Sequence, residues 1–200
     1  MRQAIDPGIC SKNLQRVKDA VSEVESAGVK LTIINIGGGY PCKYSSFRNH
    51  VALMDIATTV ETEVKRLELT QQLITEPGRR IVANAGVAVT SVIGRSEKHG
   101  KKWLFLDMGV YSGLMQTAKF QESTRYYITS LDKKEADEEE LVTYSLAGPT
   151  GDGPDVIDRE ALLPKNLEIG DRLVIHDIGA YSLPTVCPFH AFPQPCVYLV

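Results

Sequence analysis

The sequence predicts an α/β region followed by a mainly β region, and two observations carry this prediction. In the first 80 residues, segments with apolar residues at helical spacing alternate with short apolar strands, a pattern typical of parallel α/β structure. After about residue 100, short β-like runs are separated by turn residues and no long helical pattern recurs.

The first region is expected to read helix, strand, helix, strand, over residues 9–27, 31–36, 47–67 and 72–75. Gly28 stops the first helix, because glycine is favoured just past a helix C-terminus. The run 31–36 is too apolar for a strand with one wet face, so it predicts a strand of a buried parallel sheet.

The second region is expected to be built from short strands, over residues 103–106, 126–129, 141–145, 172–175 and 196–200. Residues 81–95 are apolar and ambiguous between helix and strand. The charge run 131–141 predicts a solvated hairpin loop rather than a binding site.

Composition is that of an ordinary globular protein, with 43% hydrophobic residues and a formal charge of -3 over 200 residues. The basic residues form no stripe, so no nucleic-acid partner is expected, and no apolar run is long enough to span a membrane. The four cysteines show neither a CxxC pair nor metal-ligand spacing. We therefore predict reduced thiols, no metal and a cytoplasmic location.

Three consecutive glycines, Gly37, Gly38 and Gly39, end the strand at 31–36. Glycine weakens strands, so a triplet indicates a close approach of the backbone to something, and its N–H groups can bind a phosphate. The next strand ends in "EPGRR", which offers Gly78 and Arg79 for the same purpose. Two tight turns with an incidental surface arginine remain the alternative, since neither GxGxxG nor a Walker motif is present.

Taken in order, "INIGGGYP", "TEPGRRIVANAG", "LFLDMGVYSGL", "AGPTGDGPDVI", "GDRLVIHDIGAYS" and "FHAFPQPCVYLV" resemble the pyridoxal-phosphate decarboxylases of the alanine-racemase-like fold. Within that group, which acts on ornithine, lysine, diaminopimelate and arginine, the stretches look most like ornithine/lysine decarboxylases. The resemblance implies the last strands of a pyridoxal-phosphate-binding (β/α)8 barrel over residues 1–90. Residues 91–200 are then the C-terminal β domain, whose final segments return to the active site.

The resemblance also implies roles for single residues. The phosphate of the cofactor is expected on Gly37, Gly38, Gly39, Gly78 and Arg79, with the phenol of Tyr181 reaching it too. Glu76 is expected to face the pyridine nitrogen, because a carboxylate there keeps that nitrogen protonated and strengthens the ring as an electron sink.

The substrate's distal amine is expected on Asp152, since a carboxylate pairs with an ammonium group. An aspartate of an ordinary Asp-Gly turn is the alternative. Phe189 is expected to line the site, or else to be a plain core aromatic. The family's proton-donating cysteine is replaced by Gly151, which predicts slow or altered chemistry.

Relatives carry their Schiff-base lysine well upstream of the glycine triplet, so that segment is expected to be missing here. The first interpretation is the C-terminal portion of a decarboxylase of polyamine synthesis, acting on a small basic amino acid as a homodimer or in a heterodimer with a full-length relative. The second is a non-catalytic homologue that pairs with an active decarboxylase. A hydrolase is disfavoured, because the sequence contains neither HExxH nor GxSxG. The choice between ornithine, lysine and diaminopimelate stays open.

Overall fold

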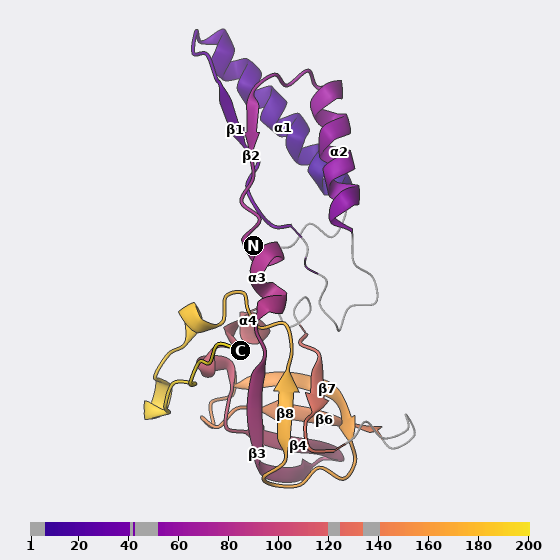
Figure 1. Ribbon diagram of the computed structural model, residues 1–200, viewed down its shortest axis with the longest axis vertical. Coiled ribbons are helices and arrows are strands. Elements are labelled where there is room, and N and C mark those ends of the chain that lie inside the picture. Colours follow the sequence, from indigo (N-terminus) through magenta and orange to yellow (C-terminus); the bar gives the residue numbers. More distant parts are fainter. Residues whose placement is uncertain (1–6, 41, 43–51, 120–124, 134–140) are drawn as a thin grey trace. The chain divides into compact units, whose positions relative to one another are not determined.

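The computed structural model describes residues 7–40, 42, 52–119, 125–133 and 141–200 (Figure 1). The described residues form two compact units, one ending at Val82 and the other beginning at Ala83. The domain boundary predicted near residue 90 stays a prediction. Each unit is described by itself.

The first unit alternates helices and strands, in the order α1 (Pro7–Ser26), β1 (Ile33–Asn35), α2 (Leu53–Arg66), β2 (Gln72–Ile74) and the short α3 (Gly78–Val82). The two strands are parallel and pair Asn35 with Ile74. The predicted order of helix, strand, helix, strand is confirmed, and Figure 1 shows β1 and β2 running beside the two long helices.

A small core joins the helices to one face of this two-stranded sheet, and it consists of Leu14, Val21, Ile34, Leu67 and Leu69. Ile34 is buried as predicted. Its neighbour Ile33, however, is 50% exposed, and Ile74 on β2 is 40% exposed. Successive strand residues point to opposite faces, so the helices cover one face of the sheet and leave the other open.

The second unit is a six-stranded sheet with short helical turns. Its strands are β3 (Ala88–Lys98), β4 (Lys101–Leu106), β5 (Ile128–Ser130), β6 (Leu141–Ala147), β7 (Val156–Pro164) and β8 (Arg172–Ile175). They lie in the order β5-β8-β3-β4-β6-β7, and every pair is antiparallel except β4 with β6.

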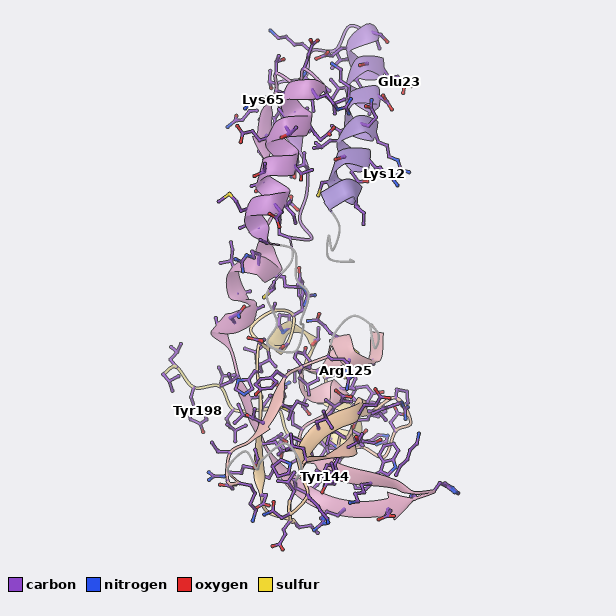
Figure 2. All side chains as sticks on the ribbon, turned by 90° about the vertical axis from the view of Figure 1, so that its right-hand side faces the viewer. Lys12, Glu23, Lys65, Arg125, Tyr144 and Tyr198 are labelled. Atoms are coloured by element: carbon purple, nitrogen blue, oxygen red, sulfur yellow. The ribbon has the colours of Figure 1, made fainter. Side chains whose placement is uncertain are left out.

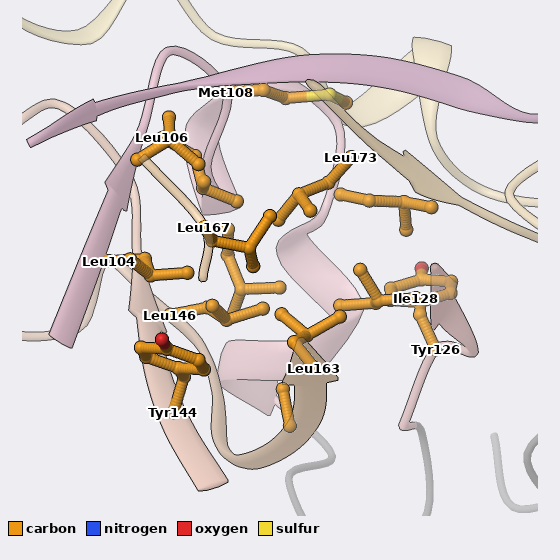
Figure 3. Close-up of a cluster of buried hydrophobic side chains, with 14 of the residues drawn as sticks. Leu104, Leu106, Met108, Tyr126, Ile128, Tyr144, Leu146, Leu163, Leu167 and Leu173 are labelled. Carbon is orange, nitrogen blue, oxygen red and sulfur yellow. The ribbon is translucent and has the colours of Figure 1, made fainter. Parts of the chain in front are cut away.

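The sheet curls around one apolar core, drawn in Figure 3, to which Leu104, Leu146, Leu163 and Leu173 contribute nearly inaccessible side chains. Its two edge strands, β5 and β7, contact each other. Near that contact the Arg125 guanidinium lies 3.0 Å from the Asp158 carboxylate of β7.

Several local predictions needed correction. The ambiguous run 81–95 contains the end of α3, a 3-10 turn at Ala83–Ala85 and the start of β3. Strand β7 was not predicted, because its apolar residues are interrupted by charged ones. The strand predicted at 196–200 is absent: the segment pairs with no strand, and Tyr198, labelled in Figure 2, is 81% exposed. Most of the predicted loop 131–141 lies outside the described residues.

Within the described ranges no helix has the length and apolar character needed to cross a bilayer.

Candidate functional site

The glycine triplet follows β1 directly and forms an open turn against the segment that follows β2. Gly37 and Gly39 have φ angles of +73° and +86°, which side-chain-bearing residues rarely adopt. A Cβ placed on Gly38 would overlap the carbonyl oxygen of Glu76. The turn therefore requires glycine for two different reasons, backbone conformation and close approach.

Glu76 is tied to this turn through both its backbone and its side chain. Its N–H donates to the Gly37 carbonyl at 2.9 Å. Its Oε1 accepts a 2.7 Å hydrogen bond from Asn35 Nδ2. The Glu76 carbonyl in turn accepts from the N–H of Gly78, the first residue of α3, and the half-buried Arg79 follows.

These residues fit the group that the sequence resemblance implies. No described atom lies within 4 Å of the place that a Cβ would take on Gly37, so the turn leaves free space beside its backbone. Among the described residues, only Oε1 of the Glu76 carboxylate is engaged, by Asn35, and Oε2 can therefore accept a hydrogen bond from a ring nitrogen. Arg79 adds a cation for a phosphate.

In the second unit, Asp152 is held by Tyr111, which lies in the quoted stretch "LFLDMGVYSGL" but was assigned no role from the sequence. The Tyr111 hydroxyl donates a hydrogen bond to Asp152 Oδ2. This bond, followed by desolvation and the nearby carboxylate charges, raises the pKa of Tyr111 to about 12. Tyr111 therefore keeps its proton at neutral pH and the phenol acts only as a donor to the carboxylate.

Aromatic rings complete this cluster. Phe189 stacks on Tyr111 with ring centroids 4.2 Å apart and on His190 with centroids 4.1 Å apart. His190 Nδ1 lies 3.2 Å from the carbonyl oxygen of Thr150, two residues before Asp152. A carbonyl only accepts, so Nδ1 carries the proton in this contact.

The side chain of Asp155 forms hydrogen bonds to both of the loops that carry Tyr111 and Asp152. It is 1% exposed and accepts from Val110 N at 2.7 Å and from the Thr150 hydroxyl at 2.6 Å. A Cβ on Gly109 or on Gly148 would overlap its Oδ1. Both glycines are therefore required for the buried carboxylate to fit.

The remaining predicted residues are placed as follows. Gly151 has a φ angle of +71° and open space at its Cβ position, so it contributes backbone alone. Tyr181, in the second unit, has a φ angle of +59° and is 50% exposed. Asp107, which was not among the predicted residues, accepts from the Thr90 hydroxyl at 2.5 Å and from Ser91 N at 2.9 Å, which gives it a structural role between β3 and β4.

Sequence reasoning brought Asp152 and Phe189 into one site, and the structure places them in one cluster through Tyr111. It missed three polar residues: Asn35, Tyr111 and Asp155. A usable signal existed for Asn35, because a polar side chain directly before the glycine triplet interrupts an apolar strand. Nothing local marks Asp155 as buried, since it follows a Gly-Pro turn in which aspartate is common.

No group of three or more His, Cys, Asp or Glu side chains among the described residues is arranged to hold a metal ion. No disulfide bond involves any of the four cysteines, all of which lie within the described residues.

Comparison with known proteins points to one family. The sequence model described as "Pyridoxal-dependent decarboxylase, C-terminal sheet domain" matches residues 9–179. A diaminopimelate decarboxylase of Archaeoglobus fulgidus is 31% identical over 94% of this chain. That match covers 44% of the relative, so the chain spans a little under half its length.

Solved structures agree in fold. The diaminopimelate decarboxylase of Methanocaldococcus jannaschii superposes with a TM-score of 0.82 at 27% identity, over 97% of this chain and 44% of that one. A lysine/ornithine decarboxylase of Vibrio vulnificus, complexed with putrescine, has a TM-score of 0.77 at 31% identity, over 97% and 51% respectively. Relatives of both substrate types thus resemble the chain to a similar degree, and the expected closer likeness to ornithine/lysine decarboxylases is not established. On the family match and these likenesses, the chain belongs to the pyridoxal-dependent decarboxylases.

Proposed function

We propose that this chain supplies the phosphate-binding turns, the ring-nitrogen carboxylate and the substrate-amine carboxylate of a decarboxylase for a small basic amino acid, lysine or ornithine. By the same proposal, its first unit is the last part of a (β/α)8 barrel. The observation that carries the proposal is the carboxylate of Asp152, held by Tyr111 in a cluster with Phe189.

This cluster suits an ammonium group. A carboxylate attracts it by charge, and aromatic faces attract it through cation–π interaction. The distal end of diaminopimelate carries a carboxylate as well, which needs a cation beside it. Among the described contacts of Asp152 there is a phenol and no lysine or arginine, which supports the simpler diamino acids. Diaminopimelate remains the second candidate, because relatives acting on it match over 94% of the chain.

When bound, pyridoxal phosphate supplies a ring that accepts the electron pair left as carbon dioxide departs. The chain's own residues bind and orient. Gly37, Gly38, Gly39, Gly78, Arg79 and Tyr181 are proposed to hold the phosphate. Glu76 is proposed to keep the proton on the ring nitrogen.

Asp152 is proposed to fix the far end of the substrate by its ammonium group. Gly151 offers no acidic proton, so reprotonation of the product carbon has to come from another group or from water. We therefore expect a completed site built with this chain to be slow.

Substrate class is tested by titrating the chain with lysine, ornithine and meso-diaminopimelate, following the backbone amide NMR signals of residues 150–153 and 155. We expect lysine or ornithine to shift these signals more than diaminopimelate, and Asp152→Asn to remove the response. The control Glu97→Gln, on an exposed strand position, should respond as the unaltered chain does. An equal response to diaminopimelate, or one that survives in Asp152→Asn, contradicts the proposed class.

We further propose that the site is completed by a second subunit, a copy of this chain or a full-length relative. The test co-expresses the chain with a full-length lysine/ornithine decarboxylase whose own matching aspartate is changed to alanine. We expect a mixed dimer on size exclusion and a low but measurable activity that Asp152→Asn in this chain abolishes. A mixed dimer whose activity never exceeds that of the altered relative alone favours a non-catalytic partner.

A further inference from the structure

The side chain of Asn35 reaches both the glycine turn and Glu76. It is the last residue of β1 and pairs with Ile74, two residues before Glu76. It also borders a cavity of about 330 Å³, together with Gly37, Gly38 and Tyr40. All of these residues belong to the first unit.

The two ends of the Asn35 carboxamide have different partners. Its Oδ1 accepts from Gly37 N at 2.8 Å, and its Nδ2 donates to Glu76 Oε1 at 2.7 Å. An N–H only donates and an ionised carboxylate only accepts, so these partners fix which end is oxygen and which is nitrogen. Aspartate keeps the acceptor and loses the donor, whereas alanine loses both.

The backbone makes the arrangement stiff. Glu76 N donates to Gly37 O at 2.9 Å, and Ile36 N donates to Ile74 O at 3.0 Å. A Cβ on Gly38 would overlap the Glu76 carbonyl, which shows how closely the two segments approach. The carboxamide thus adds a side-chain bridge to two segments that are already joined through their backbones.

We infer that Asn35 is a positioning residue that aims the Glu76 carboxylate at the cofactor's ring nitrogen while holding the glycine turn. This inference rests on the proposed function, in which Glu76 faces that nitrogen. One carboxylate oxygen is held by Nδ2, and the other is left to accept from the ring. A neutral amide achieves this orientation without placing a second negative charge beside Glu76.

The experiment uses the whole chain and two ligands, pyridoxal phosphate and its analogue in which carbon replaces the ring nitrogen. Binding is followed by the NMR shifts of the amides of residues 37–39, which tolerates weak affinity. The ratio of the two dissociation constants measures the ring-nitrogen contact. Exchange of the Gly37 amide proton measures the other half of the bridge.

Asn35→Asp is the decisive variant. It retains an acceptor for the Gly37 N–H, so we expect the exchange rate of the Gly37 amide proton to stay unchanged. It also repels the Glu76 carboxylate, so we expect the preference for pyridoxal phosphate over the carbon analogue to fall about 10-fold. A change of that size corresponds to the loss of one hydrogen bond to a charged group. Asn35→Ala should lose the preference and also accelerate Gly37 exchange. Gln72→Ala, an exposed amide at the other end of the paired strands, is the matched control and should change neither quantity.

The possible results separate the two proposals. If the unaltered chain and Asn35→Asp prefer pyridoxal phosphate over the carbon analogue equally, the role of Asn35 is wrong and the proposed function stands. An unaltered chain without any preference overturns the proposed role of Glu76 and with it the inference about Asn35, whereas the proposed role of Asp152 is decided by the substrate titration. Loss of the preference in Asn35→Asp with slow Gly37 exchange supports the inference, because general misfolding would accelerate that exchange as well.

Discussion

The two units differ in how completely they bury their own apolar side chains. The second unit wraps six strands around a core of fifteen buried residues, whereas the first buries five such residues in its described cluster. In the first unit, β1 and β2 each leave an isoleucine, Ile33 and Ile74, exposed to solvent. Hydrophobic stabilisation grows with the apolar area removed from water, so the second unit should be much the more stable. The residues proposed to bind the cofactor's phosphate and ring nitrogen lie mainly on the weaker unit.

The largest expected difference comes from matched leucines in the two cores. Leu104→Ala removes a fully buried side chain from the second unit and should cost about 2–5 kcal/mol. Leu14→Ala should cost about half as much, because Leu14 already borders the cavity of the first unit. Urea unfolding separates the two: fluorescence of Trp103, the single tryptophan, reports the second unit, and circular dichroism at the helix band reports mainly the first.

The same melt tests the comparison in the unaltered chain. We expect the helical signal to be lost at a lower urea concentration than the tryptophan signal changes. Coincident curves would mean that the chain unfolds as one cooperative body. The two units would then not differ in stability, which would contradict the prediction.

A second prediction concerns the buried carboxylate of the second unit. Asp155→Asn replaces an acceptor of the Thr150 N–H and hydroxyl by an NH2 group that faces them. We expect a loss of about 1–3 kcal/mol in the tryptophan-detected transition and no change in the first unit. Glu97→Gln, an exposed change on β3, serves as the control and should be nearly neutral. A neutral effect of Asp155→Asn would deny that this side chain holds the two loops together.

A smaller effect is expected from the ion pair between Asp132 and Arg172 at the edge of the sheet. The guanidinium and backbone N–H of Arg172 lower the pKa of Asp132 to about 2. Because the folded-state pKa is depressed, the contribution to stability is present above the unfolded pKa of about 4 and is lost as pH falls through about 2. The stability gap between the unaltered chain and Asp132→Asn should therefore shrink over this range, and a gap independent of pH would exclude the pair as its cause.

The smallest expected effect on stability belongs to Tyr111→Phe. The hydrogen bond to Asp152 raises the folded-state pKa of Tyr111 to about 12. The contribution of this tyrosine to folding stability is therefore complete below the unfolded-state pKa of about 10 and is lost as pH rises through the folded-state pKa. An absorbance titration at the phenolate band, taken as the difference between the unaltered chain and Tyr111→Phe, should show one tyrosine ionising near pH 12. Ionisation near pH 10 would mean that the hydrogen bond to Asp152 is absent in solution.

Helical periodicity and the apolar strand at 31–36 were sufficient to predict the element order of the first unit, because both patterns are local. The short strands β4, β5, β6 and β8 of the second unit were also predictable from β-prone runs bounded by turn residues, but the longer β3 and β7 were not. Strand β7 was not, since three consecutive charged residues, Asp158, Arg159 and Glu160, interrupt its apolar pattern. Its pairing with β6 shifts register at the same place, which no local pattern indicates. The strand predicted at residues 196–200 was wrong for the opposite reason. The composition of this segment is β-prone, but a segment forms no strand without a neighbouring strand to pair with.

By itself, the sequence determined the family resemblance, the glycine turn, and the aspartate and glutamate that the proposal uses. Those are properties of residue type and spacing along the chain. Only the tertiary structure decided that Tyr111 donates to Asp152, that Asp155 is buried between two loops, and that Asn35 bridges Gly37 and Glu76. Tyr111, Asp155 and Glu76 each lie 41 or 45 residues from the partner they bind. Contacts at such separations depend on strand pairing and loop closure, which no short stretch of sequence encodes.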